Sequence, residues 1–189
     1  MNQSCMKSTA LLLSTFLLSG FLSVAASQTA VKTLPAGAFA VEFDVTCPGS
    51  PGLVYDHLTG DITGWWDHSF SPKPLKLFIE PRPGGGFYEI FNERGDGVLH
   101  ATVIYAERGK MLRFDGPLGL SGRTVQAVTT YSLAPEGPDS TRLSLAVRIQ
   151  GEIDVQLATV VNTVWHHFLI ERFKPYIEEV VRTDRGKSR

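Results

Sequence analysis

The chain has 189 residues, of which 43% are hydrophobic and 20% are charged, and its formal net charge is −1. Its length and apolar content indicate one globular domain with a sizeable core rather than a disordered chain. A net charge this close to zero argues against a nucleic-acid-binding protein, because phosphate neutralisation requires a concentrated face of Lys and Arg. The partners that this composition favours are small or uncharged molecules.

Residues 1–26 have the organisation of a secretory signal peptide. Lys7 gives a positive start, residues 10–22 form a short apolar run, and small residues precede a cleavage site near Ala26. An uncleaved membrane anchor is the alternative, but the run is shorter than the roughly 20 residues that span a bilayer. We therefore expect an exported protein, periplasmic or secreted, with no stable membrane anchor after cleavage.

Cleavage would leave Cys47 as the only cysteine, because it also removes Cys5. It would change the net charge from −1 to −2, because Lys7 is the only charged residue lost. A single cysteine cannot form an internal disulfide, even in an oxidising compartment. We expect Cys47 to be a small buried apolar residue rather than a nucleophile.

The mature chain divides into a leader, a domain and a tail. The leader of residues 27–38 lacks periodicity, the domain comprises residues 39–182, and residues 183–189 form a polar tail. The segment "AFAVEFDVTC", residues 38–47, alternates apolar with polar or small residues. This period of two is typical of a half-buried strand.

Two short helices are expected after this first strand. Ser50 is a candidate N-cap and Pro51 stands at the first helical position, a combination typical of a helix start. Gly60 then predicts a break, which a second short helical turn would follow.

The middle of the chain predicts six further strands, because its apolar residues again recur at every second position. Turns rich in Gly, Pro, Asp and Glu separate them. The predicted strands are residues 75–80, 87–92, 97–106, 110–115, 125–133 and 141–149. The glycine-rich segment at residues 116–122 is either a plain solvent loop or a lid over a pocket.

The last part of the chain changes to a helical period. Leu157, Val161, Val164 and Phe168 fall on one face of a long amphipathic helix, which Pro175 should kink or restart. An antiparallel sheet with one wet face needs cover on the other, and only this helix is long enough. We therefore predict an α+β fold, with a curved antiparallel seven-stranded sheet wrapped around the C-terminal helix.

Three motifs resemble those of a known superfamily. They are the pair Trp65-Trp66, the segment "GGGFYE" at residues 84–89, and "WHHFLIERFK" at residues 165–174. On these motifs the chain resembles the START-like (SRPBCC) helix-grip superfamily over roughly residues 39–180. The branch it resembles is that of homologues of an activator of the heat-shock ATPase, which also holds many polyketide cyclase-like proteins. The resemblance implies a deep hydrophobic cavity between sheet and helix, used for lipids, sterols, polyketides and other apolar ligands.

The inward-facing residues around this cavity are the candidate ligand contacts. Trp65 and Trp66 cannot both face the same way, so one should fill the core and the other should close the pocket mouth or cap the sheet. Structural packing is the favoured interpretation of the pair, and pocket lining by one of them is the alternative. The expected ligand-binding residues are Trp66, Phe87, Phe114, Thr129, Tyr131, Val147, Val161, Trp165 and Phe168.

Glu89 and His100 are the candidate catalytic residues. A carboxylate beside an imidazole can support general acid–base chemistry if both groups face the cavity. The sequence does not fix the strand register, so an exposed Glu89 with an exposed or rim His100 is the alternative.

The five histidines do not predict a metal site. No H-x-x-x-H or H-E-x-x-H spacing occurs, and the adjacent His166 and His167 should point about 100° apart on a helix. Gly84-Gly85-Gly86 precedes a strand rather than a helix, so it is not a phosphate-binding loop. No cofactor is expected.

Three functions remain open. The first is an exported protein that binds an apolar small molecule in the cavity. The second is an enzyme of the cyclase or dehydratase type that acts on a polyketide-like chain in the same cavity. The third is an interaction protein that modulates an ATPase, which export weakens because cytosolic chaperones are absent beyond the membrane.

Overall fold

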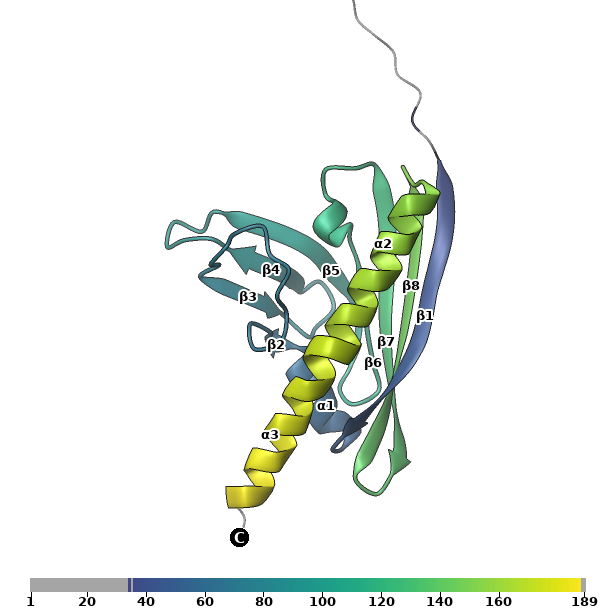
Figure 1. Ribbon diagram of the computed structural model, residues 1–189. Helices are drawn as coiled ribbons and strands as arrows, with labels where there is room; N and C mark the ends of the chain where they lie inside the picture. Colours follow the sequence, from purple (N-terminus) through teal and green to yellow (C-terminus); the bar gives the residue numbers. More distant parts are fainter. Residues whose placement is uncertain (1–33, 35, 188–189) are drawn as a thin grey trace, which may run out of the picture. The chain divides into compact units, whose positions relative to one another are not determined.

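Figure 1 shows the computed structural model, which describes Leu34 and residues 36–187. The expected signal peptide and most of the expected leader therefore lie outside the described residues. The elements in chain order are β1 (Gly37–Pro48), α1 (Pro51–Leu58), β2 (Gly60–Asp61), β3 (Lys76–Ile79), β4 (Gly86–Ile90), β5 (Gly97–Glu107), β6 (Met111–Asp115), the 3-10 helix η1 (Leu118–Leu120), β7 (Val125–Gly137), β8 (Ser140–Gly151), α2 (Val155–His166), the π-helix η2 (His167–Phe173) and α3 (Lys174–Lys187).

The strands form one antiparallel sheet with a long helix against one face. In the described part of the chain the sheet has eight strands in the order β1-β8-β7-β6-β5-β4-β3-β2. Every neighbouring pair is antiparallel, and β1 pairs with β8 along the whole length of both strands. The sheet twists strongly between β6 and β4, as Figure 1 shows. The predicted α+β class and the sheet-and-helix architecture are confirmed.

The structure corrects the segment after the first strand. Within the described residues a single short helix, α1, follows β1, and the two-residue strand β2 comes next as an additional strand of the sheet. The expected second helix is only one turn, in which the Trp66 N–H donates to the Ile62 carbonyl at 2.9 Å. The helix ends because Thr59 is extended and Gly60 adopts a φ of 68°, a left-handed conformation that favours glycine. Gly60 and Asp61 then pair with Ile79 and Phe78 of β3.

Helix α1 begins as the sequence predicts. The Ser50 side chain accepts a hydrogen bond from the Leu53 backbone N–H at 3.3 Å, and Pro51 occupies the first turn. At the other end, the Thr59 hydroxyl donates to the Tyr55 carbonyl at 3.0 Å. These bonds fix both ends of a helix that buries Val54 and Leu58 in the core.

The C-terminal elements α2, η2 and α3 form one continuous rod (Figure 1). Asp154 caps its start by accepting a hydrogen bond from the Leu157 N–H at 2.7 Å. Pro175 was expected to kink or restart the helix, but the chain widens into a π-helix just before it, where the Lys174 N–H donates to the Leu169 carbonyl. Proline lacks an N–H and crowds the carbonyl four residues earlier, and the wider turn accommodates both effects. No helix in the described region has the length and apolar character to cross a membrane.

The core lies between the long helix and the covered face of the sheet. On β8 the side chains of Leu143, Leu145 and Val147 are buried while Arg148 is exposed, as their alternation predicts. Cys47 is fully buried, and this burial raises the pKa of its thiol to about 12. Its thiol therefore stays protonated at ordinary pH and packs as a small apolar group.

Candidate functional site

A cavity of about 570 Å³ lies between the long helix and the sheet. This volume falls within the range of small-molecule sites. Its wall is mostly apolar and is formed by Trp66, Asp67, His68, Ser69, Phe70, His100, Pro117, Leu118, Gly119, Leu120, Ala127, Val147, Ile149, Leu157, Val160, Val161, Val164, Trp165 and Phe168.

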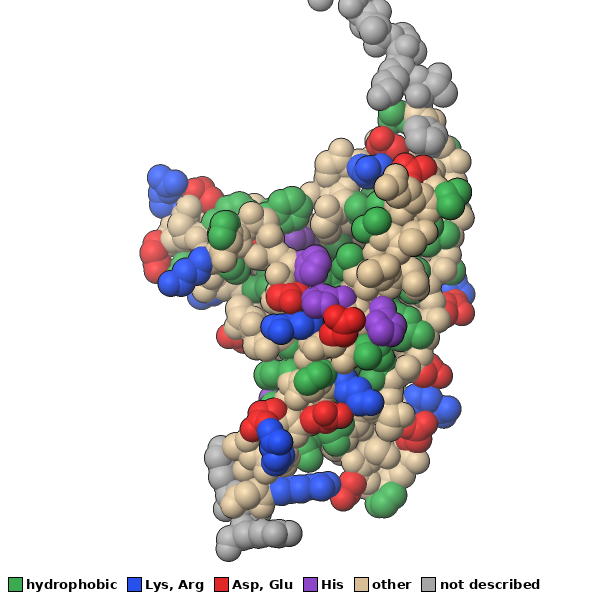
Figure 2. All heavy atoms as spheres, viewed as in Figure 1, with side chains coloured by type: hydrophobic (Ala, Val, Ile, Leu, Met, Phe, Trp, Pro, Cys, Tyr) green, Lys and Arg blue, Asp and Glu red, His purple; other side chains and the backbone are tan. Residues whose placement is uncertain are grey.

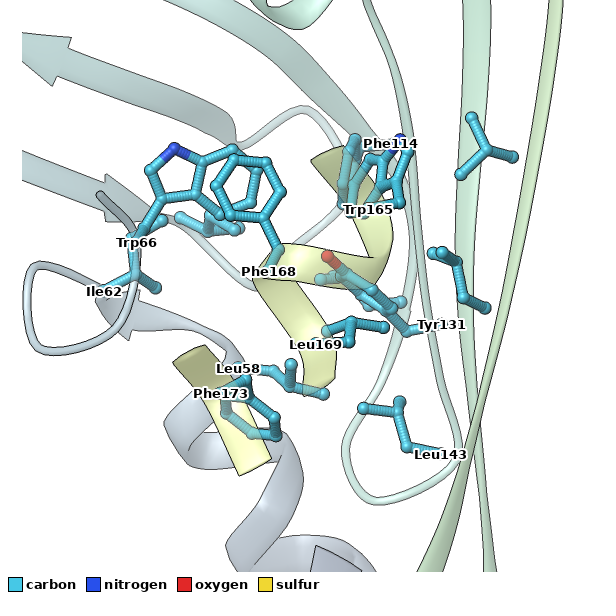
Figure 3. Packing of buried hydrophobic residues seen from close by; sticks show 14 of the residues in the cluster. Leu58, Ile62, Trp66, Phe114, Tyr131, Leu143, Trp165, Phe168, Leu169 and Phe173 are labelled. Atoms are coloured by element: carbon cyan, nitrogen blue, oxygen red, sulfur yellow. The ribbon is translucent and has the colours of Figure 1, made fainter. Parts of the chain in front are cut away.

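Differences in side-chain size explain where the hollow lies. The sheet contributes Ala127 and Val147, and α2 contributes Val161 and Val164 opposite them. These short side chains leave space between the two layers. Bulky residues fill the neighbouring part of the same interface, where Tyr131 and Trp165 pack edge to face at 6.2 Å between ring centroids (Figure 3).

The tryptophan pair divides between core and cavity wall, which is the alternative of pocket lining by one of the two. Trp65 is 1% exposed, and its indole N–H donates to the His57 carbonyl at 3.0 Å. Trp66 is on the cavity wall and stacks on Phe168, with ring centroids 3.8 Å apart and planes 20° apart (Figure 3). Its indole N–H donates to the His68 carbonyl at 2.7 Å, so the ring is held at both its face and its edge.

The nine residues expected to contact a ligand fall into two groups. Those on the cavity wall are Trp66, Val147, Val161, Trp165 and Phe168. Those buried in the core and not among the wall residues are Phe87, Phe114, Thr129 and Tyr131. The second group lies behind the first: Phe87 contacts the edge of Trp66, and Tyr131 contacts Trp165. Strand alternation identifies the covered face but does not show where along that face the helix leaves space.

Two loops contribute cavity-wall residues that are not among the nine expected ligand-binding residues. One is residues 67–70 after the tryptophan pair, and the other is residues 117–120, which include η1. Leu118 has a φ of 51°, a left-handed conformation that costs a non-glycine residue roughly 1–2 kcal/mol. Residues 117–120 of the glycine-rich segment thus form part of the cavity wall and are not a plain solvent loop, whereas a role as a lid stays a prediction.

Glu89 and His100 form a buried pair at the cavity. His100 is 4% exposed and is on the wall, with Nε2 at 3.0 Å from Glu89 Oε2. Glu89 is fully buried behind it and also accepts hydrogen bonds from the backbone N–H groups of Phe70 at 3.0 Å and Ser71 at 2.7 Å. The alternative of an exposed Glu89 and an exposed or rim His100 is wrong.

A β-bulge explains why the register could not be read from the sequence. Tyr88 pairs with Leu99 and Phe87 pairs with Ala101, so His100 is the extra residue of β5 at this point. The bulge lets His100 and Ala101 both face the interior, which regular alternation forbids. Since Glu89 lies against Nε2, the geometry favours the tautomer that donates from Nε2 and leaves Nδ1 as an acceptor.

The hydroxyl groups of Thr129 and Tyr131 have no hydrogen-bond partner among the residues that the structure describes. Both follow Ala127 on the inward face of β7, next to the cavity floor. Burial raises the pKa of Tyr131, so its hydroxyl stays protonated. Buried polar groups without partners are uncommon in folded proteins.

A polar cluster of Asp67, His68 and His167 lies at the cavity rim. His68 Nδ1 is 2.9 Å from Asp67 Oδ1, and His167 Nε2 is 2.9 Å from Asp67 Oδ2. These residues come from the loop after the tryptophan pair and from η2, so chain spacing could not reveal the cluster. His166 packs against Phe43, with ring centroids 6.1 Å apart, and is not among the three residues of the cluster.

The charges around this rim cluster shift two pKa values. Burial would raise the pKa of Asp67, but hydrogen bonds from His68 and His167 and the charges of His167 and Arg172 lower it. The hydrogen bond to Glu171 and then that to Asp67 raise the pKa of His167. The cluster therefore favours an ionised carboxylate beside a cation.

Comparison with known proteins identifies the fold. No protein-family profile and no curated protein matches the chain. A protein of unknown function from Staphylococcus aureus, SA2116, superimposes with a TM-score of 0.59 at 15% identity, over 80% of this chain and 98% of that protein. Protein MLL2253 from Mesorhizobium loti gives 0.55 at 18% identity, over 75% of this chain and 98% of that one. Truncated norcoclaurine synthase from Thalictrum flavum gives a TM-score of 0.51 at 10% identity, over 80% of this chain and 98% of that one.

The chain has the helix-grip fold. The resemblance to START-like (SRPBCC) proteins that the sequence motifs indicate is thus confirmed at the level of the fold. At 10–18% identity, the likeness carries no activity from these proteins to this helix-grip domain.

Proposed function

We propose that this helix-grip domain binds an apolar small molecule, such as a lipid, a sterol or a polyketide-like compound, in the cavity between α2 and the sheet. The observation that carries the proposal is the hollow of about 570 Å³ with a predominantly apolar wall. A ligand that replaces water there gains roughly 25 cal/mol for each Å² of apolar surface removed from water. That gain is the main driving force for binding in such a site.

The polar groups of the wall indicate how the ligand would be oriented. Asp67, His68 and Ser69 come from the same loop, and His100 comes from β5. The helix side of the wall carries Val161, Val164 and other apolar residues. We therefore expect a ligand with a large apolar body and few polar groups, which lie on the loop side.

A fluorescent fatty acid tests the proposal, with two valine substitutions in the same helix. Val161 is 8% exposed and is on the wall, whereas Val155 is 87% exposed and is not. Val161→Trp should fill the hollow and weaken probe binding at least tenfold, and Val155→Trp should leave it unchanged. Equal binding by both variants, or no saturable binding by the wild type, would count against the proposal.

We also propose that the protein is exported, with cleavage near Ala26. This rests on the sequence of residues 1–26 alone. The test is to express the chain with its native N-terminus and to measure the mass of the protein recovered outside the cytoplasm. Cleaved protein that begins at or near Ser27 is expected, and an intact N-terminus on protein retained in the cytoplasm would refute export.

A second candidate function is an enzyme of the cyclase or dehydratase type, which the buried Glu89–His100 pair favours. His100 reaches the wall while Glu89 orients it from behind. With Nε2 directed at Glu89, His100 Nδ1 is the atom placed to remove a proton from a ligand carbon next to a carbonyl. The electron pair of the broken C–H bond would form the enolate.

Deuterium exchange tests this chemistry without the natural substrate. In D₂O, the wild type should accelerate exchange of the acidic C–H protons of an apolar 1,3-diketone, as followed by NMR. His100→Gln should abolish the acceleration and leave probe binding in place. If the wild type gives no acceleration, the binding function stands alone.

A further inference from the structure

His167 at the cavity rim lies between two carboxylates. His167 Nε2 faces Asp67 at 2.9 Å, and His167 Nδ1 faces Glu171 Oε2 at 2.9 Å. A neutral imidazole carries a single N–H, so it can donate to only one of these two carboxylates. The other contact is made either by a protonated imidazole or through a metal ion, and Arg172 Nε also lies 3.1 Å from Asp67 Oδ2.

We propose that Asp67, His68 and His167 bind a divalent transition-metal ion at the rim of the cavity. Each of these residues offers one ligand atom, and the three atoms lie within 4.8 Å of one another. Two imidazole nitrogens and one carboxylate oxygen form a donor set that suits zinc and similar ions. Ligands of a single zinc ion lie roughly 3–4 Å apart, since each bond is about 2.0–2.1 Å long. Small side-chain rotations therefore suffice to bring the three atoms together.

The surroundings of His167 support this assignment. Glu171 Oε2 lies 2.9 Å from His167 Nδ1, so a neutral imidazole that donates from Nδ1 to Glu171 presents its Nε2 lone pair to an ion held by Asp67. A carboxylate behind a histidine ligand is the usual arrangement around protein-bound metals. Figure 2 shows histidine side chains grouped with acidic and basic side chains near the middle of this face.

One further charged group at the rim, Arg172, limits the affinity of the three residues for a metal ion. Arg172 Nε lies 3.1 Å from Asp67 Oδ2 and competes with an ion for that carboxylate. His166 Nδ1 lies 4.0 Å from Glu171 Oε1 and is not among the three ligands. The side chains of His68, Asp67 and His167 are 52%, 35% and 28% exposed, so an ion reaches them from solvent without a change of fold.

The position of the proposed metal site beside the cavity indicates which part of a ligand it would bind. Asp67 and His68 are both rim ligands and cavity-wall residues. Three protein ligands leave at least one coordination position open on a zinc ion. An apolar ligand with an anionic head group, such as a carboxylate, could therefore bind with its body in the cavity and its head on the metal.

A zinc titration of the full chain without a polyhistidine tag tests the site. The titration uses Zn²⁺ in competition with a chromogenic chelator at pH 7.5, with no apolar ligand present. We expect one more zinc ion bound by the wild type than by His167→Ala or His68→Ala, or an affinity at least tenfold weaker in each variant. His166→Ala is the matched control, because it removes a neighbouring exposed imidazole and should bind as the wild type does.

Other sites in the chain are common to all four proteins and cancel in this comparison. Circular dichroism checks that the variants are folded, and His68→Ala in the loop serves if His167→Ala is not. Zinc binding that is the same in the wild type and both ligand variants, or lost equally in His166→Ala, would overturn the proposal. The titration contains no apolar molecule, so its failure is distinct from failure of the cavity to bind one.

Discussion

Two of the carboxylate–imidazole contacts at the cavity, one inside and one at the rim, have similar geometry and opposite surroundings. His100 and Glu89 approach to 3.0 Å with side chains 5% and 0% exposed, whereas His167 and Asp67 approach to 2.9 Å with side chains 28% and 35% exposed. The inner pair is shielded from water and also holds a loop through two backbone N–H groups. The rim contact is open to water, protons and ions. The two contacts therefore have different roles despite their similar lengths, because one is buried and the other is open to water. The inner pair positions the cavity wall, and the rim contact can exchange its cation.

The largest expected effect is that of removing the inner carboxylate. Glu89→Ala leaves His100 and the N–H groups of Phe70 and Ser71 without their acceptor. Breaking a buried pair in this way costs about 3–5 kcal/mol. The free energy of unfolding, measured by denaturant titration, should fall by that amount.

The matched change at the rim is Asp67→Ala, which should cost less than about 1 kcal/mol because water can replace an exposed partner. Equal losses of stability in the two variants would show that burial does not separate the two contacts.

Removal of a buried polar group that has no hydrogen-bond partner should not lower the stability, unlike removal of the Glu89 carboxylate. The hydroxyl of Tyr131 is buried and has no hydrogen-bond partner among the described residues. Tyr131→Phe removes it while keeping the ring that packs on Phe114 and Trp165. Stability should stay the same or rise by up to about 1 kcal/mol, since no hydrogen bond is lost. A clear decrease in the melting temperature would show that the hydroxyl has a partner, such as a buried water molecule.

The smallest expected effect is the pH dependence of the stability that His167 contributes at the rim. Contacts with Glu171 and Asp67 raise the pKa of His167 above the ordinary value of 6.5. Its contribution to stability is therefore complete below pH 6.5 and is lost as the pH rises through the raised pKa. The wild type should lose slightly more stability than His167→Gln over that interval, by less than about 1 kcal/mol. Parallel pH profiles would contradict the raised pKa.

The sequence predicted regular elements well, because burial on one face imposes a strict period. The alternation of Leu143, Leu145 and Val147 fixed the inner face of β8, and Ser50 with Pro51 fixed the start of α1. The two-residue strand β2 is too short to show a period, so the sequence did not predict it.

The site was less predictable, because it depends on departures from regular structure. His100 faces inward only because of a β-bulge, and the widened π-helix begins at His167. The rim cluster joins residues that are 100 positions apart, His167 and Asp67, which no spacing rule connects. Sequence alternation could identify the covered face, whereas the position of the hollow depends on how the helix lies across it.

Photolabelling with a fatty acid that carries a diazirine group tests the central claim most directly, because it reports where an apolar molecule binds. After irradiation and digestion, the account predicts label on peptides that carry wall residues, chiefly those with Val161 and Leu118, and loss of this label in Val161→Trp. The exposed apolar side chains of Leu99 and Ile104 on β5 provide the competing location. Label confined to that outer surface, and unchanged in Val161→Trp, would contradict the account.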